Sequence, residues 1–147
     1  MKGLGTALVT PFLENGEVDY PALGSLVEHQ IAGGIDYLVV LGTTSEVPTL
    51  TISEQDAIVS YISKQVNGRI PLVMGIGGNC TRAVVDRIHQ MSDILSKHFA
   101  AILSVTPYYN RPQQEGLYQH FCAVAEASPV PVILYNVPKR TGVNLLP

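Results

Sequence analysis

Polar side chains that could bind an acid and move protons follow three apolar segments of the chain. Gly42-Thr-Thr-Ser-Glu46 follows the first, and Thr106-Pro-Tyr-Tyr-Asn-Arg-Pro112 follows the second. N-V-P-K-R-T-G, residues 136–142, follows the third, directly after Tyr135. Backbone N–H groups and hydroxyls in a tight loop can hold a carboxylate, and a phenol beside a guanidinium can combine proton transfer with anion binding. Together the loops predict a small carboxylate-binding, proton-transferring pocket.

Each loop alone also fits a plainer role. Tyr135 could be a core tyrosine followed by a solvated turn, and residues 42–46 could merely cap a helix. Tyr108 and Tyr109 could pack or contact another subunit. The recurrence of such residues after several strands favours the pocket.

The composition excludes several classes of protein. Of the 147 residues, 46% are hydrophobic and 14% charged, and the net charge of −3 is spread without runs, which excludes a basic nucleic-acid footprint and a polybasic membrane patch. No apolar run approaches the roughly 18 residues that span a bilayer. Cys80 and Cys122 lack CxxC spacing, and the four histidines lack metal-ligand spacing. We therefore expect a soluble cytoplasmic protein without a metal or another cofactor.

Apolar periodicity and capping signals predict alternating strands and helices. Asp19 can cap a helix with Pro21 in its first turn, Thr51 and Glu54 have capping-box spacing, and residues 136–142 are expected to continue neither strand nor helix. The predicted strands are 4–9, 36–41, 70–74, 101–105 and 132–134. The predicted helices are 19–31, 51–66, 81–95 and 114–127.

This β–α unit of about 30 residues fits an α/β fold with a parallel sheet, either doubly wound or a (β/α)₈ TIM barrel. Candidate residues follow strands two to five alike, which favours the barrel because all its strands end at one mouth. A barrel needs about 250 residues, so we expect residues 1–147 to be the N-terminal part of one TIM-barrel domain, ending before the sixth strand. The glycines at 75–79 lack both nucleotide-binding glycine patterns, which disfavours a phosphate loop.

Three stretches resemble the dihydrodipicolinate synthase family of class I, pyruvate-dependent lyases. They are G-T-T-S-E at 42–46, T-P-Y-Y-N-R-P-Q-Q-E-G-L-Y-Q-H-F at 106–121 and L-Y-N-V-P-K-R-T-G at 134–142. The resemblance covers the whole chain but about half of the family's barrel. It implies condensation of a pyruvate Schiff base with aspartate semialdehyde on the route to diaminopimelate and lysine.

The resemblance also assigns roles to individual residues. Thr43, Tyr109 and Tyr135 match the proton relay, and Tyr135 would also position the lysine-bound intermediate. Thr44 matches the residue that holds the pyruvate carboxylate, and Arg140 the one that receives the carboxylate of the semialdehyde. Since the family's equivalent of Tyr109 reaches into a neighbouring subunit, a homotetramer built from two tight dimers is implied.

The sequence departs from the family at two places. Ser45 stands where members commonly have glycine, so a positive φ there would cost about 1 kcal/mol or more. The family's Schiff-base lysine lies on the sixth strand, and none of the lysines here has a matching context, so we expect the isolated chain to be inactive. These lysines are Lys2, Lys64, Lys97 and Lys139.

The family's lysine-feedback site is only partly present. Asn79 and Tyr108 remain as a possible remnant, whereas Ile52, Gln55 and Ala83 replace its histidines and glutamate. We therefore expect weak or absent inhibition by lysine. Two alternatives stay open, namely another pyruvate-dependent aldolase, of the N-acetylneuraminate lyase or keto-deoxy-sugar type, and a non-catalytic half-barrel.

Overall fold

The structure is a computed structural model that describes residues 2–147, and these divide into two compact units between Met74 and Gly75. The first unit contains β1 (Gly5–Ala7), α1 (Tyr20–Ala32), β2 (Tyr37–Val40), the 3₁₀ turns η1 (Thr43–Ser45) and η2 (Val47–Thr49), α2 (Ile52–Val66) and β3 (Leu72–Gly75), whose last residue begins the second unit. The second unit contains α3 (Thr81–Gln90), α4 (Ser92–His98), β4 (Ala101–Val105), α5 (Gln114–Ala127), β5 (Val132–Tyr135) and α6 (Pro138–Thr141).

The helices of the first unit begin and end within one residue of the predicted bounds. The Asp19 side chain accepts a hydrogen bond from the Ala22 N–H and caps α1. At α2, the Thr51 side chain accepts from the Glu54 N–H while the Glu54 carboxylate accepts from the Thr51 N–H, so the capping box is confirmed. Asn67 ends α2 in the left-handed conformation, with φ 46°. Asparagine tolerates this conformation, which explains the stop.

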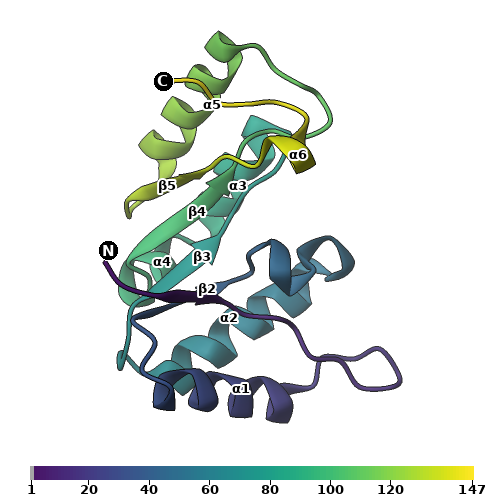
Figure 1. Ribbon diagram of the computed structural model, residues 1–147, viewed down its shortest axis with the longest axis vertical. Helices are drawn as coiled ribbons and strands as arrows, with labels where there is room; N and C mark the ends of the chain where they lie inside the picture. The colour runs from purple at the N-terminus through teal and green to yellow at the C-terminus, as the bar shows by residue number, and fades with distance from the viewer. Residues whose placement is uncertain (1) are drawn as a thin grey trace. The chain divides into compact units, whose positions relative to one another are not determined.

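The first unit combines parallel strands with a pair of packed helices. β1 pairs in parallel with β2, and Leu38 to Val40 of β2 pair with Leu72 to Met74 of β3. Figure 1 shows α1 beside α2. Val27 of α1 and Val59 of α2 are fully buried. Each such side chain contributes about 1.5–3 kcal/mol on burial.

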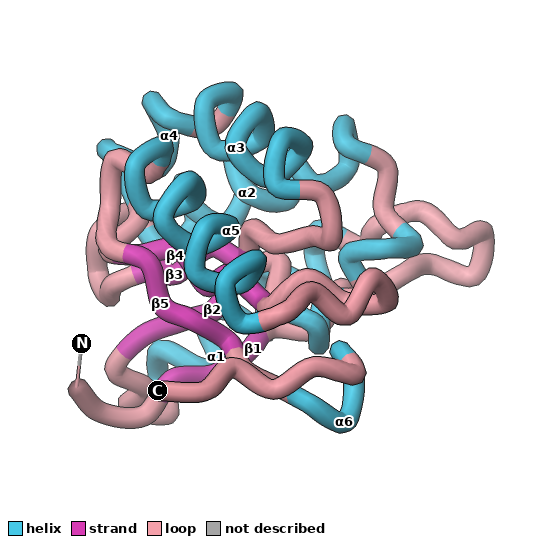
Figure 2. Tube along the Cα trace, turned by 90° about the horizontal axis from the view of Figure 1, so that it is seen from above, coloured by secondary structure: helices cyan, strands magenta, loops and turns pink. Residues whose placement is uncertain are grey.

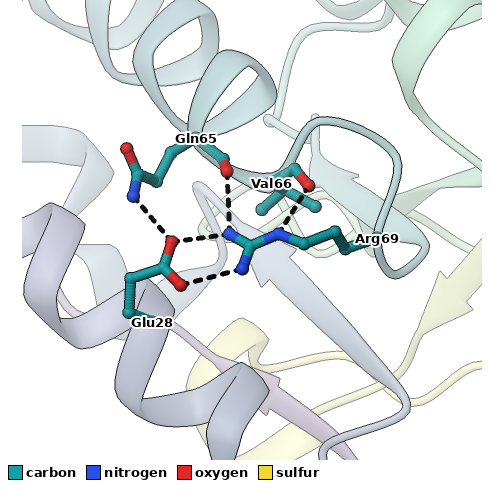
Figure 3. Close-up of polar contacts among 4 residues, drawn as sticks. All are labelled: Glu28, Gln65, Val66 and Arg69. Atoms are coloured by element: carbon teal, nitrogen blue, oxygen red, sulfur yellow. Dashed lines mark hydrogen bonds and ion pairs between the residues drawn. The ribbon is translucent and has the colours of Figure 1, made fainter.

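An exposed polar network connects α1 to the turn after α2 (Figure 3). The Arg69 guanidinium donates to both carboxylate oxygens of Glu28, at 2.5 and 2.8 Å, and the Gln65 amide donates to one of them at 2.6 Å. The hydrogen bonds from Arg69 and Gln65 lower the pKa of Glu28 to about 2. The contribution of the ionised Glu28 carboxylate to folding stability is therefore complete above its ordinary pKa of about 4.5 and is lost as the pH falls towards 2.

The second unit also has a parallel strand pair, in which β4 is largely buried and β5 is largely exposed. β4 pairs with β5 from Ile102 opposite Val132 to Val105 opposite Tyr135. Figure 2 shows α3 and α5 next to each other, and each buries an apolar side chain, Ile88 on α3 and Leu117 on α5. Within each unit, neighbouring strands are consecutive in the chain and parallel, as in both architectures considered above.

Two predictions about this unit are wrong. The helix predicted over 81–95 is two helices, because Met91, with φ −97° and ψ 3°, ends α3 before α4 begins. The segment 136–142, predicted to be entirely irregular, contains the single turn α6. Pro138 suits the first turn of a helix, and Gly142, with φ 74°, ends it in the left-handed conformation.

The glycine-rich segment 75–79 has a packing explanation. A Cβ placed on Gly77 would lie 2.8 Å from the Val105 Cγ1 and 3.0 Å from the Val105 backbone nitrogen. The backbone N–H of Ile76 donates to the Leu103 carbonyl, so this segment runs directly along β4. Glycine at position 77 therefore allows two backbones to approach closely.

Candidate active site

The loop after β2 presents two free hydroxyl groups. Thr43 and Thr44 form most of η1 and are exposed, and within the described residues neither hydroxyl makes a hydrogen bond. The chain reverses around them, since the Ser45 N–H donates to the Gly42 carbonyl and the Glu46 N–H to the Thr43 carbonyl. Such a turn can offer hydroxyl and N–H donors to a carboxylate.

Ser45 anchors this loop to the end of β1. Its side chain is 3% exposed, and its hydroxyl donates to the Leu8 carbonyl at 2.7 Å. The Thr10 hydroxyl donates to the Ser45 carbonyl at 2.8 Å. Ser45 lies in the right-handed 3₁₀ turn and does not have a positive φ. The strain considered for a serine at this position is therefore absent, and the hydroxyl gains a buried partner that glycine lacks.

In the second unit, the loop after β4 holds two residues in the left-handed region. Tyr109 has φ 70° and Arg111 has φ 49°. The Asn110 N–H donates to the Tyr108 carbonyl at 2.8 Å, which closes a γ-turn around Tyr109. The Asn110 side chain donates to the Asn79 carbonyl at 2.7 Å and ties the loop to the segment before α3. Strained backbone of this kind is concentrated at functional sites.

The end of β5 and the turn α6 are held by internal hydrogen bonds. Tyr135 is half-buried at the last position of β5, and its carbonyl accepts from the Thr106 N–H. Thr141 is 3% exposed, and its hydroxyl contacts the carbonyls of Val137 and Val143. Arg140, one residue earlier, is exposed. A firmly held turn therefore presents an exposed guanidinium.

An open cleft of about 670 Å³ lies between these two loops of the second unit. Its volume is in the range of small-molecule sites. Its lining is aromatic and cationic. The lining residues are Tyr108, Tyr109, Arg111, Lys139, Arg140, Thr141 and Gly142.

The structure brings together only some of the predicted site residues. Tyr108, Tyr109 and Arg140 line the cleft, whereas Tyr135 is not among its lining residues. Thr43 and Thr44 belong to the first unit and are described there by themselves. Sequence reasoning gave no site role to Arg111, although its position before Pro112, in the loop with the paired tyrosines, was the available signal.

None of the four lysines is enclosed in an apolar pocket. All four are exposed to solvent, whereas desolvation in a hydrophobic pocket is a usual way to activate a Schiff-base lysine. Lys139 differs from the other three in sharing a cleft with Arg111 and Arg140. Within residues 2–147 there is also no cluster of side chains suited to a metal ion. No helix in this range is both long and apolar enough to cross a membrane.

Comparison with known proteins identifies the family. A family model described as the dihydrodipicolinate synthetase family matches residues 1–147. The chain belongs to this family. It is 56% identical over 145 residues to the 4-hydroxy-tetrahydrodipicolinate synthase of Parabacteroides distasonis, covering 99% of this chain and 48% of that protein.

Solved structures of dihydrodipicolinate synthetase family members share the fold. A chloride-inhibited dihydrodipicolinate synthase from Acinetobacter baumannii, complexed with pyruvate, is 46% identical with a TM-score of 0.92, covering 97% of this chain and 48% of that one. The 4-hydroxy-tetrahydrodipicolinate synthase of Methylacidiphilum fumariolicum SolV is 40% identical with a TM-score of 0.93, covering 99% and 47%.

These comparisons decide between the two architectures. The matching structures are TIM barrels, and the prediction of a TIM-barrel fold is confirmed. The chain spans about half the length of the relatives that it matches.

Proposed function

We propose that the protein containing this chain is a 4-hydroxy-tetrahydrodipicolinate synthase, a lyase that condenses pyruvate with L-aspartate 4-semialdehyde. The observation that carries the proposal is the arrangement after β5 in a chain of this family. Tyr135 ends the strand, and Arg140 follows on α6 and lines a cationic cleft. A guanidinium there suits a short acid better than a long polyol, which favours this activity over cleavage of N-acetylneuraminate.

In the proposed mechanism, a lysine outside residues 1–147 attacks the keto carbon of pyruvate and forms an imine with loss of water. Thr44 holds the pyruvate carboxylate. Loss of a methyl proton gives an enamine, whose carbon attacks the aldehyde carbon of the semialdehyde, while Arg140 holds the carboxylate of that substrate. The amino group of the condensed semialdehyde then displaces the lysine from the imine carbon, which closes the ring and releases the product. Thr43, Tyr109 and Tyr135 carry protons to and from the reacting atoms. This chain therefore supplies binding and proton transfer, and not the covalent nucleophile.

Assembly and compartment are part of the same proposal. The Tyr109 side chain is 88% exposed, which supports insertion into a neighbouring subunit of a homotetramer. The two free cysteines support a cytoplasmic location. We also propose weak inhibition by lysine, since Ile52 and Ala83 cannot pair with the ammonium groups of lysine. Light scattering and inhibition assays with lysine test these points.

Borohydride trapping tests the mechanism. The protein containing this chain is incubated with pyruvate, reduced with borohydride, digested, and its peptides are assigned by mass spectrometry. We expect a reduced pyruvate adduct on a lysine outside residues 1–147, and none on Lys2, Lys64, Lys97 or Lys139. An adduct on one of these four would overturn the assignment of roles. Condensation activity with aspartate semialdehyde, measured beside cleavage of N-acetylneuraminate, then tests the reaction itself.

A further inference from the structure

Three cationic side chains share the cleft of the second unit without a protein partner. Arg111, Lys139 and Arg140 all line it. Within residues 2–147, none of the three side chains forms a hydrogen bond or an ion pair, in contrast to Arg69, which is paired with Glu28. Like charges in one cleft repel, and a bound anion relieves that repulsion. The cleft therefore offers positive charge without a protein partner to a bound anion.

Arg111 is held in this cleft by its surroundings. A Cβ on Gly142 would lie 3.0 Å from the Arg111 Nε and 3.7 Å from its Cζ. The guanidinium therefore packs against the residue that ends α6, two positions after Arg140. Its backbone, with φ 49°, stands between the γ-turn at Tyr109 and Pro112, and proline restricts the conformations of the residue before it.

We infer that Arg111 is a second carboxylate-binding residue and a determinant of acceptor specificity. Together with Arg140, it would bind the carboxylate of the incoming semialdehyde, an inference that rests on the proposed function. Two guanidinium groups can share the two oxygens of one carboxylate through charge-assisted hydrogen bonds, whereas Lys139 adds only a flexible point charge. An acceptor without a carboxylate leaves the charges unpaired and is rejected.

Binding is measured by calorimetry with L-homoserine, which keeps the amino-acid carboxylate and has an alcohol in place of the aldehyde. The protein containing this chain is compared with its R111N, R111K and R82Q variants. Asparagine accepts the left-handed backbone of position 111, and Arg82 is an exposed arginine on α3 that does not line the cleft. We expect R111N to weaken binding about tenfold, R111K to lie between R111N and the unmodified protein, and R82Q to change nothing.

Kinetics separate binding from a purely structural role. R111N should raise the KM for aspartate semialdehyde about tenfold, with the KM for pyruvate and kcat unchanged, because only the acceptor carboxylate uses Arg111. Equal homoserine affinity in R111N and the unmodified protein, or a matching rise in the KM for pyruvate, would overturn the inference. An unmodified protein that binds homoserine but lacks condensation activity would instead refute the proposed function.

Discussion

The hydroxyl of Ser45 should stabilise the first unit by a measurable amount. Ser45→Ala keeps the 3₁₀ turn but removes the 2.7 Å hydrogen bond to the Leu8 carbonyl, whose residue is 2% exposed. Leaving a buried carbonyl without its partner costs about 2 kcal/mol. Ser45→Gly loses the same bond and adds about 0.5–1 kcal/mol of backbone entropy, so we expect it to lower the free energy of unfolding by about 2.5–3 kcal/mol.

The assay is urea unfolding of the protein containing this chain, followed by circular dichroism. A lower midpoint at unchanged m-value reports lost stability. Ser25→Ala is the matched control, because that exposed hydroxyl also donates to a backbone carbonyl, that of Pro21, and should change stability by less than about 0.5 kcal/mol.

A double-mutant cycle with Thr10→Val tests whether the two hydroxyls act together, since the Thr10 hydroxyl donates to the Ser45 carbonyl. We expect a coupling free energy of at least about 0.5 kcal/mol. A Ser45→Gly protein as stable as the unmodified one would refute the reasoning, since it would show that the Leu8 carbonyl gains nothing from the serine.

Two further predictions concern the second unit. Gly77→Ala should destabilise this unit by about 2 kcal/mol or more, because the new Cβ would lie 3.0 Å from the backbone nitrogen of Val105. The urea unfolding midpoint measures the loss, and an unchanged midpoint would contradict the close packing. Burial lowers the pKa of His120, so the stability that comes from its neutral form is complete above its ordinary pKa of about 6.5 and is lost as the pH falls through the lowered value. An NMR titration should find the His120 midpoint below 6.5, and the acid-induced loss of stability should be smaller in H120Q; a midpoint above 6.5 would exclude this effect.

Local signals in the sequence were enough to predict most of the elements. The caps at Asp19 and Thr51 and the stop at Asn67 act through neighbouring backbone groups, so they can be recognised without the fold. The break between α3 and α4 at Met91 was not predicted, because the sequence has no glycine or proline there. It is seen only in the backbone angles of Met91.

The site was less predictable because its chemistry comes from separate loops. The resemblance supplied roles for Tyr109 and Arg140, but the sequence does not state that Arg111 lies against Gly142, 31 residues away, since that contact depends on how two loops fold. The value of serine at position 45 was equally hidden, because the partner of its hydroxyl is the distant residue Leu8.

The left-handed backbone at Tyr109 and Arg111 predicts a trade-off between stability and activity. Glycine would relieve the backbone at both positions, whereas the functions proposed here need the large side chains. A library selected only for heat resistance should therefore enrich glycine or asparagine at these positions. A library selected for lysine-independent growth should retain tyrosine and arginine. Different residues at these two positions in the two selected libraries would indicate that the protein retains a less stable backbone because its activity needs the tyrosine and the arginine.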